Sequence, residues 1–285
     1  MRLIGLLLLA AALPAAVEKI YLVERGDFGE RYERVSARAY FVIDPKLPVN
    51  QAIRDIDRAP VDAQGMVRFS ADLVVIKPRD PATGNGSILF EVSNRGGRGL
   101  PGTFGEPFLM EQGFTLVWVG WQWDVPISKD LLRVYPPIGQ GIEAMIRSEL
   151  VPHVTTTTMS LGDSNMQAYV ASGSVKLTVR DGRDGKRQEI REGWRLNTAK
   201  TGIEMASGFQ PFQIYEALYA TKDPVVAGTG LAAIRDVISF LRYENKGTVL
   251  LGDQYRHMKR AIAFGSSQSG RFLRQYIYDL SLIHI

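Results

Sequence analysis

A serine-rich turn near the end of the printed sequence holds the side chain best suited to chemistry. A short apolar run, Ala261–Phe264, precedes it, and an amphipathic run, Arg271–Asp279, follows it. This order predicts a strand, a sharp turn and a helix, with small residues two positions before and after Ser267. The turn is close to the G-x-S-x-G pattern, in which strain exposes the serine hydroxyl. The pattern predicts Ser267 as a nucleophile and the backbone N–H of Gln268 as a donor to an oxyanion.

The neighbouring serines fit this pattern less well. Ser266 has Phe264 two positions before it, and Ser269 has Arg271 two positions after it. Ser269 also stands where the pattern has its second glycine. A Ser- and Gly-rich turn without any chemistry is the alternative interpretation.

Two apolar runs predict further strands that must position this turn. Ser87–Asn94 and Phe114–Gly120 are nearly continuous apolar runs, as expected for strands covered on both faces. Between them lie the glycine-rich stretch Arg95–Gly99 and a helical stretch at residues 106–112, with Gly113 as its C-cap. The order predicts a β-α-β unit with parallel strands.

The rest of the chain divides into regular and irregular stretches. Residues 35–41 and 67–75 alternate apolar and polar side chains, which predicts half-buried antiparallel strands. The pattern breaks up over residues 125–221, which we interpret as an insertion with at least one hairpin strand at Val175–Val179. An amphipathic helix is expected from Leu231 to about Tyr243.

The composition excludes several kinds of site. The chain has 285 residues and a net charge of +4, with 34 basic residues scattered among 30 acidic ones, so no nucleic-acid patch forms. It has no cysteine, and its three histidines lack H-E-x-x-H spacing. We therefore expect no disulfide, no cysteine nucleophile, no metal and no other cofactor. The composition does not predict an oligomeric state.

Both ends of the sequence look unlike the body of a domain. Residues 1–16 have the form of a secretory signal, with Arg2 before an apolar core and small residues after Pro14. This predicts a secreted or periplasmic protein with no stable membrane span after cleavage; an uncleaved anchor is the alternative. Residues 280–285 match the product of a sequencing-adapter end, the alternative being a continuation of the last helix. Residues 17–279 would then be the N-terminal part of a domain.

Three phrases of the sequence resemble a known family. They are Asn94-Arg-Gly-Gly97, Gly120-Trp-Gln-Trp-Asp124 and Gly265-Ser-Ser-Gln-Ser-Gly-Arg271. They are similar to exported bacterial α/β-hydrolase-domain proteins with a β-rich N-terminal part. The resemblance covers residues 34–279 apart from the insertion. It implies the α/β class and an α/β-hydrolase fold, with antiparallel strands leading into a mostly parallel sheet that is incomplete at the C-terminus.

The resemblance also implies where the site lies. Open α/β sheets bind ligands at the carboxyl ends of their strands. The loop that holds Gly96 and Gly97 would supply a second oxyanion donor, although a plain tight turn is the alternative. Trp121 and Trp123 could line a substrate pocket, whereas Trp118 falls within a buried strand and is expected in the core.

The other two members of a catalytic triad are not evident. In this fold the chain order is serine, then an acid, then histidine. Asp279 would lie at the far end of the helix after Ser267, His257 at the amino end of the strand before it, and His153 in the insertion. We expect the acid and the histidine in a missing part, so that the 285-residue chain alone would be inactive. Arg95 is expected in a surface ion pair, the alternative being a contact with a substrate carboxylate.

The function that this sequence predicts is an exported serine hydrolase acting on small-molecule carboxylic esters. One alternative is a non-catalytic exported binding protein on the same fold. Another is a peptidase or amidase with the same triad, which the sequence does not distinguish from an esterase.

Overall fold

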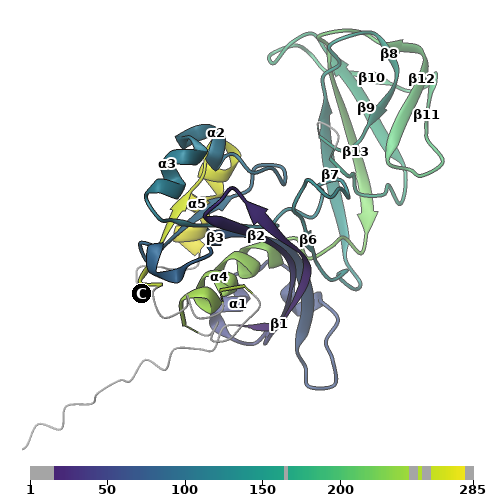
Figure 1. The fold of residues 1–285 in the computed structure, drawn as a ribbon. Helices are drawn as coiled ribbons and strands as arrows, with labels where there is room; N and C mark the ends of the chain where they lie inside the picture. The colour runs from purple at the N-terminus through teal and green to yellow at the C-terminus, as the bar shows by residue number, and fades with distance from the viewer. Residues whose placement is uncertain (1–15, 164–165, 244–249, 252–257, 280–285) are drawn as a thin grey trace, which may run out of the picture.

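A computed structural model describes residues 16–163, 166–243, 250–251 and 258–279 (Figure 1). They form a mixed sheet flanked by helices and a second, β-rich part that projects from it (Figure 1). In these ranges no helix is both long and apolar enough to span a bilayer. The proposed signal cleavage region before Ala16, the proposed adapter end and His257 lie outside the described residues.

The main sheet has seven strands, and its direction changes partway across. Its strands are β1 (Val17–Phe28), β2 (Tyr32–Ile43), β3 (Val67–Pro78), β4 (Ser87–Val92), β5 (Thr115–Val119), β6 (Val134–Tyr135) and β14 (Arg260–Phe264). The order across the sheet is β1-β2-β3-β5-β4-β14, with β6 paired to β3. Neighbours are antiparallel from β1 to β5, whereas β5, β4 and β14 run parallel. The predicted antiparallel strands are present before the parallel ones, but the sheet is mixed rather than mostly parallel, because only β5, β4 and β14 pair in parallel.

Strand β1 was not among the predicted strands. Most of its side chains are exposed on both faces, so the strand shows no apolar alternation that a sequence pattern could reveal. Its pairing with β2 places it at the edge of the sheet.

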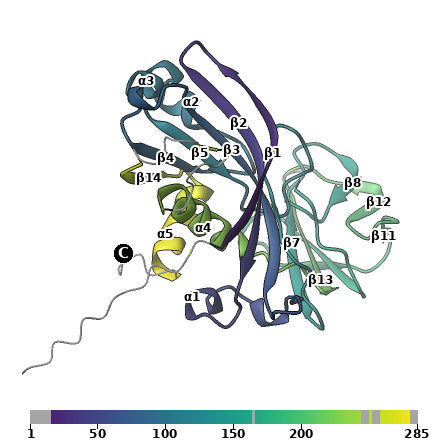
Figure 2. The same ribbon diagram turned by 60° about the horizontal axis from the view of Figure 1, so that its bottom comes forward.

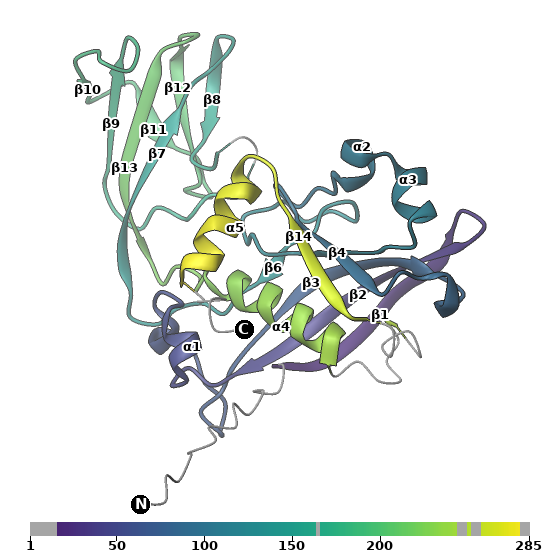
Figure 3. The same ribbon diagram turned by 90° about the vertical axis from the view of Figure 1, so that its left-hand side faces the viewer.

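Helices cover both faces of the main sheet (Figure 3). The helices of the described residues are α1 (Pro48–Gln51), α2 (Leu100–Phe104), α3 (Glu106–Glu111), α4 (Thr229–Tyr243) and α5 (Gln268–Asp279), with 3₁₀ turns at Ile56–Arg58 and Pro81–Thr83. The apolar faces of α4 and α5 share one core with the sheet, in which Phe240 and Phe272 are buried. The opposite face packs against α2 and α3 through Leu100 and Leu109. The predicted helices near 106–112 and 231–243 are confirmed.

The carboxyl ends of the three parallel strands lie at one edge of the sheet. Val92 of β4 lies opposite Val119 of β5, and Glu91 of β4 lies opposite Phe264 of β14. The segments that follow these strands must therefore leave the sheet side by side. This register brings the glycine-rich loop, the tryptophan-rich segment and the serine turn to one place.

The β-rich part consists of two small sheets around a core of their own (Figure 2). Its strands are β7 (Glu143–Leu150), β8 (Thr156–Ser160), β9 (Val175–Arg180), β10 (Gln188–Ile190), β11 (Trp194–Leu196), β12 (Gly202–Phe209) and β13 (Ile214–Lys222). One sheet has the order β10-β9-β13-β7 and the other β11-β12-β8. The predicted hairpin strand is confirmed as β9, which pairs with β10. That this part is an insertion stays an interpretation.

Candidate active site

The backbone singles out Ser267 among the three serines of the turn. Its φ of 56° lies in the left-handed region, which is uncommon for a residue other than glycine. Ser266 is exposed but has no positive φ, and Ser269 is buried inside the first turn of α5. Ser267 is itself exposed, between the end of β14 and the start of α5. This is the strained strand-to-helix turn that the sequence pattern predicts.

Close packing explains why the turn needs a small residue at Gly265. A Cβ atom there would lie 2.6 Å from the carbonyl oxygen of Ser269 and 3.0 Å from the nitrogen of Gly270. The first turn of α5 is therefore pressed against the end of β14. Gln268 is the first residue of this helix, and its N–H has no backbone acceptor outside the helix in the part of the chain that the structure describes. A helix N-terminus with a free N–H favours negative charge, as an oxyanion donor requires.

The glycine-rich loop after β4 is a tight turn in which the two glycines differ. The N–H of Gly97 donates to the carbonyl of Asn94 at 3.0 Å, so this donor is occupied. Gly96 has a φ of 77°, and an added Cβ would lie 2.8 Å from the carbonyl oxygen of Leu132. The Gly96 carbonyl accepts from the Leu132 N–H at 2.9 Å, whereas its own N–H has no backbone acceptor among the described residues. Gly96 is thus the better of the two candidate donors.

Arg95 joins this loop to the β-rich part. Its backbone N–H donates to Oε1 of Gln122 at 2.8 Å, and its guanidinium lies 2.6 Å from the carboxylate of Asp163. Asp163 follows β8 in the β-rich part, and 73% of its side chain is exposed. The expected surface ion pair of Arg95 is therefore present.

The tryptophans are anchored by specific contacts. Trp118 is fully buried, as predicted. The indole N–H of Trp121 donates to the carbonyl of Ser93 at 2.6 Å, and its ring lies 4.4 Å from that of Phe272 in α5. The ring of Trp123 lies 4.5 Å from that of Tyr169 in the β-rich part. Trp121 thus packs between β4 and α5, and a pocket lined by Trp121 and Trp123 stays a prediction.

Three polar residues at this edge were not predicted to matter. Glu91 is buried in β4, Gln122 is buried after β5, and Asp124 is half-buried two residues further on. Burial raises the pKa of Asp124, whose charge also interacts with Arg95. One signal was visible in the sequence: Glu91 is the single charged residue in the apolar run Ser87–Asn94.

No histidine lies beside Ser267 in the described ranges. His153 is exposed in the β-rich part, where its ring faces that of Phe212 at 6.4 Å, and His257 and His284 lie outside those ranges. Asp279 ends α5, about 16 Å along the helix from its first turn. The described residues also contain no cluster of three or more acidic or histidine side chains that could hold a metal.

Comparison with known proteins identifies the family. A model of the alpha/beta hydrolase domain matches residues 49–281. The chain belongs to the alpha/beta hydrolase domain family. Searches of curated proteins and of solved structures give no match. Membership supports a hydrolase-type function, which agrees with a serine turn at the carboxyl edge of the sheet.

Proposed function

We propose that this alpha/beta hydrolase is an exported serine hydrolase that cleaves carboxylic esters of small molecules. The observation that carries the proposal is the backbone of Ser267. Its positive φ, its exposure and its place at the start of α5 fit a nucleophile held out at the end of a strand. The glycine-rich loop follows the neighbouring strand β4 and so lies at the same edge of the sheet as Ser267.

The proposed chemistry is acyl transfer. The Ser267 hydroxyl attacks the ester carbonyl while a base takes its proton, and the tetrahedral oxyanion accepts hydrogen bonds from the N–H groups of Gln268 and Gly96. Collapse expels the alcohol, which regains a proton, and water then hydrolyses the acyl-serine. The base and its acid partner are assigned to residues outside those described, since His153 is remote in the β-rich part.

Labelling with a fluorophosphonate tests the nucleophile. The protein expressed from its complete coding sequence should be labelled at Ser267 and should hydrolyse p-nitrophenyl esters. Replacing Ser267 by Ala should abolish labelling and reduce kcat by more than about 1,000-fold. Ser266→Ala is the matched control, because Ser266 is also exposed but has no positive φ. Full turnover by the Ser267→Ala protein would refute the assignment.

A non-catalytic binding protein is the second candidate. The absence of a histidine beside Ser267 in the described ranges favours it. In that case the wild-type protein would resist fluorophosphonate and would still bind an ester without turnover. A peptidase or amidase would also be labelled at Ser267 and would cleave an anilide with the same acyl group, which an esterase would leave intact.

Export rests on the first sixteen residues. If the signal is cleaved after Ala16, the mature protein recovered from outside the cytoplasm should begin at Val17. N-terminal sequencing of the protein from a bacterial host checks this. A protein that keeps Met1 and sediments with membranes would favour the anchor.

A further inference from the structure

The buried carboxylate of Glu91 lies beneath the glycine-rich loop. Glu91 occupies the fifth position of the six-residue strand β4, and only 6% of it is exposed. Its side chain is on the face of the sheet that packs against α2 and α3, where Trp118 and Leu100 are also buried. Burying a carboxylate is costly unless donors satisfy it.

Neutral N–H groups surround this carboxylate. The backbone N–H of Gly99 lies 2.9 Å from both carboxylate oxygens, and that of Leu100 lies 2.9 Å from Oε2. The indole N–H of Trp118 also donates to Oε2. No ion pair to Glu91 is present in the described part of the chain. The carboxylate therefore binds the backbone N–H groups at the end of the loop.

The beginning of the same loop is fixed by other contacts. Gln122 accepts from the N–H of Arg95 at 2.8 Å, and the N–H of Leu132 donates to the carbonyl of Gly96 at 2.9 Å. With Glu91 holding Gly99, the end of the loop is tied to β4, and its beginning is tied to the segment between β5 and β6. Gly96 lies between these attachments, and its N–H keeps no backbone acceptor among the described residues.

We propose that Glu91 is a positioning residue that holds the Gly96 N–H of this loop in place for the oxyanion. The inference rests on the proposed function, because it assigns Glu91 a part in the ester hydrolysis at Ser267. The carboxylate touches neither the substrate nor Ser267. It acts through the backbone of Gly99 and Leu100, so that the donor is already oriented before the oxyanion forms.

Glu91→Gln is the decisive variant. The amide has nearly the shape of the carboxylate but replaces one acceptor oxygen by an NH2 donor, which in either orientation faces a loop N–H that donates to the carboxylate in the wild type. We expect kcat for a p-nitrophenyl ester to fall by about 10- to 100-fold, because a misplaced donor weakens binding of the transition state. KM should change by less than about twofold, since the ground-state ester does not need the donor. An unchanged kcat in the folded variant would overturn the proposal.

Two further variants separate positioning from stability. Trp118→Phe removes the indole donor to Glu91 but leaves the loop donors, so it should lower stability while keeping kcat within about threefold of wild type. Thr115→Val is the matched control for the loss of a buried polar group from β5. Thr115 is also a buried polar residue of this strand, but it lies at the end opposite Trp118. A loss of kcat in Trp118→Phe as large as in Glu91→Gln would assign Glu91 a stabilising role only.

A measurement on the wild-type protein does not depend on any variant folding. Hydrogen exchange should show the amides of Gly99 and Leu100 protected, although they lie in a loop and at the first residue of a short helix. Rapid exchange at both amides would contradict the proposal. If wild-type protein is neither labelled at Ser267 nor active on esters, the proposed function is wrong. Protected amides would then show that Glu91 holds the loop although the protein is not an esterase.

Discussion

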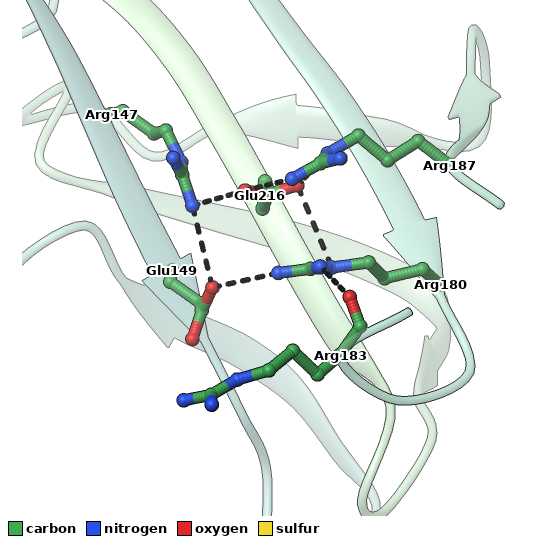
Figure 4. A network of polar contacts seen from close by, with 6 residues as sticks. All are labelled: Arg147, Glu149, Arg180, Arg183, Arg187 and Glu216. Carbon is green, nitrogen blue, oxygen red and sulfur yellow. Dashed lines mark hydrogen bonds and ion pairs between the residues drawn. The ribbon is translucent and has the colours of Figure 1, made fainter. Parts of the chain in front are cut away.

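Two buried glutamates show how differently the two parts of the molecule use a carboxylate. In the main sheet, Glu91 accepts hydrogen bonds from neutral N–H groups, two of them in the backbone where the glycine-rich loop meets α2. In the β-rich part, Glu216 of β13 is equally buried but faces three arginines (Figure 4). Its carboxylate lies 2.7 Å from Arg147 and 3.7 Å from Arg180, and it also accepts from Arg187.

The difference lies in what each carboxylate holds together. The arginines around Glu216 come from other segments, Arg147 from β7 and Arg180 from β9, so that the ion pairs join three neighbouring strands (Figure 4). Glu149 on β7 extends the network, at 3.0 Å from Arg180. A carboxylate bound to guanidinium groups fixes side chains across a sheet, whereas one bound to backbone N–H groups fixes the course of the chain. We therefore expect Glu216 to matter for stability and Glu91 for the geometry of the site.

The largest effect on stability is expected from Glu216→Ala. Removing the carboxylate takes away one of the two carboxylates beside Arg180, of which only 8% of the side chain is exposed, and leaves Glu149 as the other. The loss should be about 3 kcal/mol, at the low end for a broken buried ion pair, because Arg147 and Arg187 keep about half of their side chains in water. Hydrogen exchange should accelerate in β13 and β9 more than in β4.

Glu204→Ala supplies the control for that loss. Glu204 of β12 pairs with Arg195 at 2.7 Å, but 80% of the Arg195 side chain is exposed. This change should cost less than about 1 kcal/mol. Equal losses in the two variants would show that the arginine network around Glu216 contributes no more than a surface pair.

Acid should weaken the β-rich part through the same residue. The hydrogen bond from Arg187 is the main cause that lowers the pKa of Glu216 below its usual value of about 4.5. Because the folded state holds the carboxylate ionised, its stabilisation is complete above that value and is lost as the pH falls through the lowered pKa. Urea unfolding followed below pH 4.5 should show this loss, and Glu216→Gln should flatten it. An unchanged pH dependence in Glu216→Gln would contradict the assignment.

A smaller loss of stability, with a large loss of activity, is expected from Gly265→Ala. The added Cβ would meet the carbonyl oxygen of Ser269 at 2.6 Å, so α5 must move away from β14. Overpacking of this kind costs about 1 to 3 kcal/mol. Fluorophosphonate labelling of Ser267 should fall sharply, because the same movement displaces the turn. Gly102→Ala is the control, since none of the described residues lies within 4 Å of the added atom.

The sequence predicted more of the main sheet than of the site. Apolar runs and alternation identified β2 to β5 and the turn at Ser267, because these features depend on local pattern. The role of Glu91 could not be predicted, since its partners Gly99 and Trp118 reach it only once β4 and β5 are paired. The pairing of the β-rich strands was also beyond the sequence, because register depends on contacts with strands that are distant along the chain.

The smallest effect is expected where the two parts meet, at the ion pair of Arg95 and Asp163. Both side chains are more than a third exposed, so Asp163→Ala should change stability by less than about 1 kcal/mol. Arg95→Ala should cost no more, because the backbone N–H that holds the loop to Gln122 is retained. A double-mutant cycle on urea unfolding measures the coupling directly. Coupling near zero would leave the carboxylate of Glu91 and the amide of Gln122 as the attachments that fix the loop. A coupling above about 2 kcal/mol would instead mean that the β-rich part holds the glycine-rich loop in position.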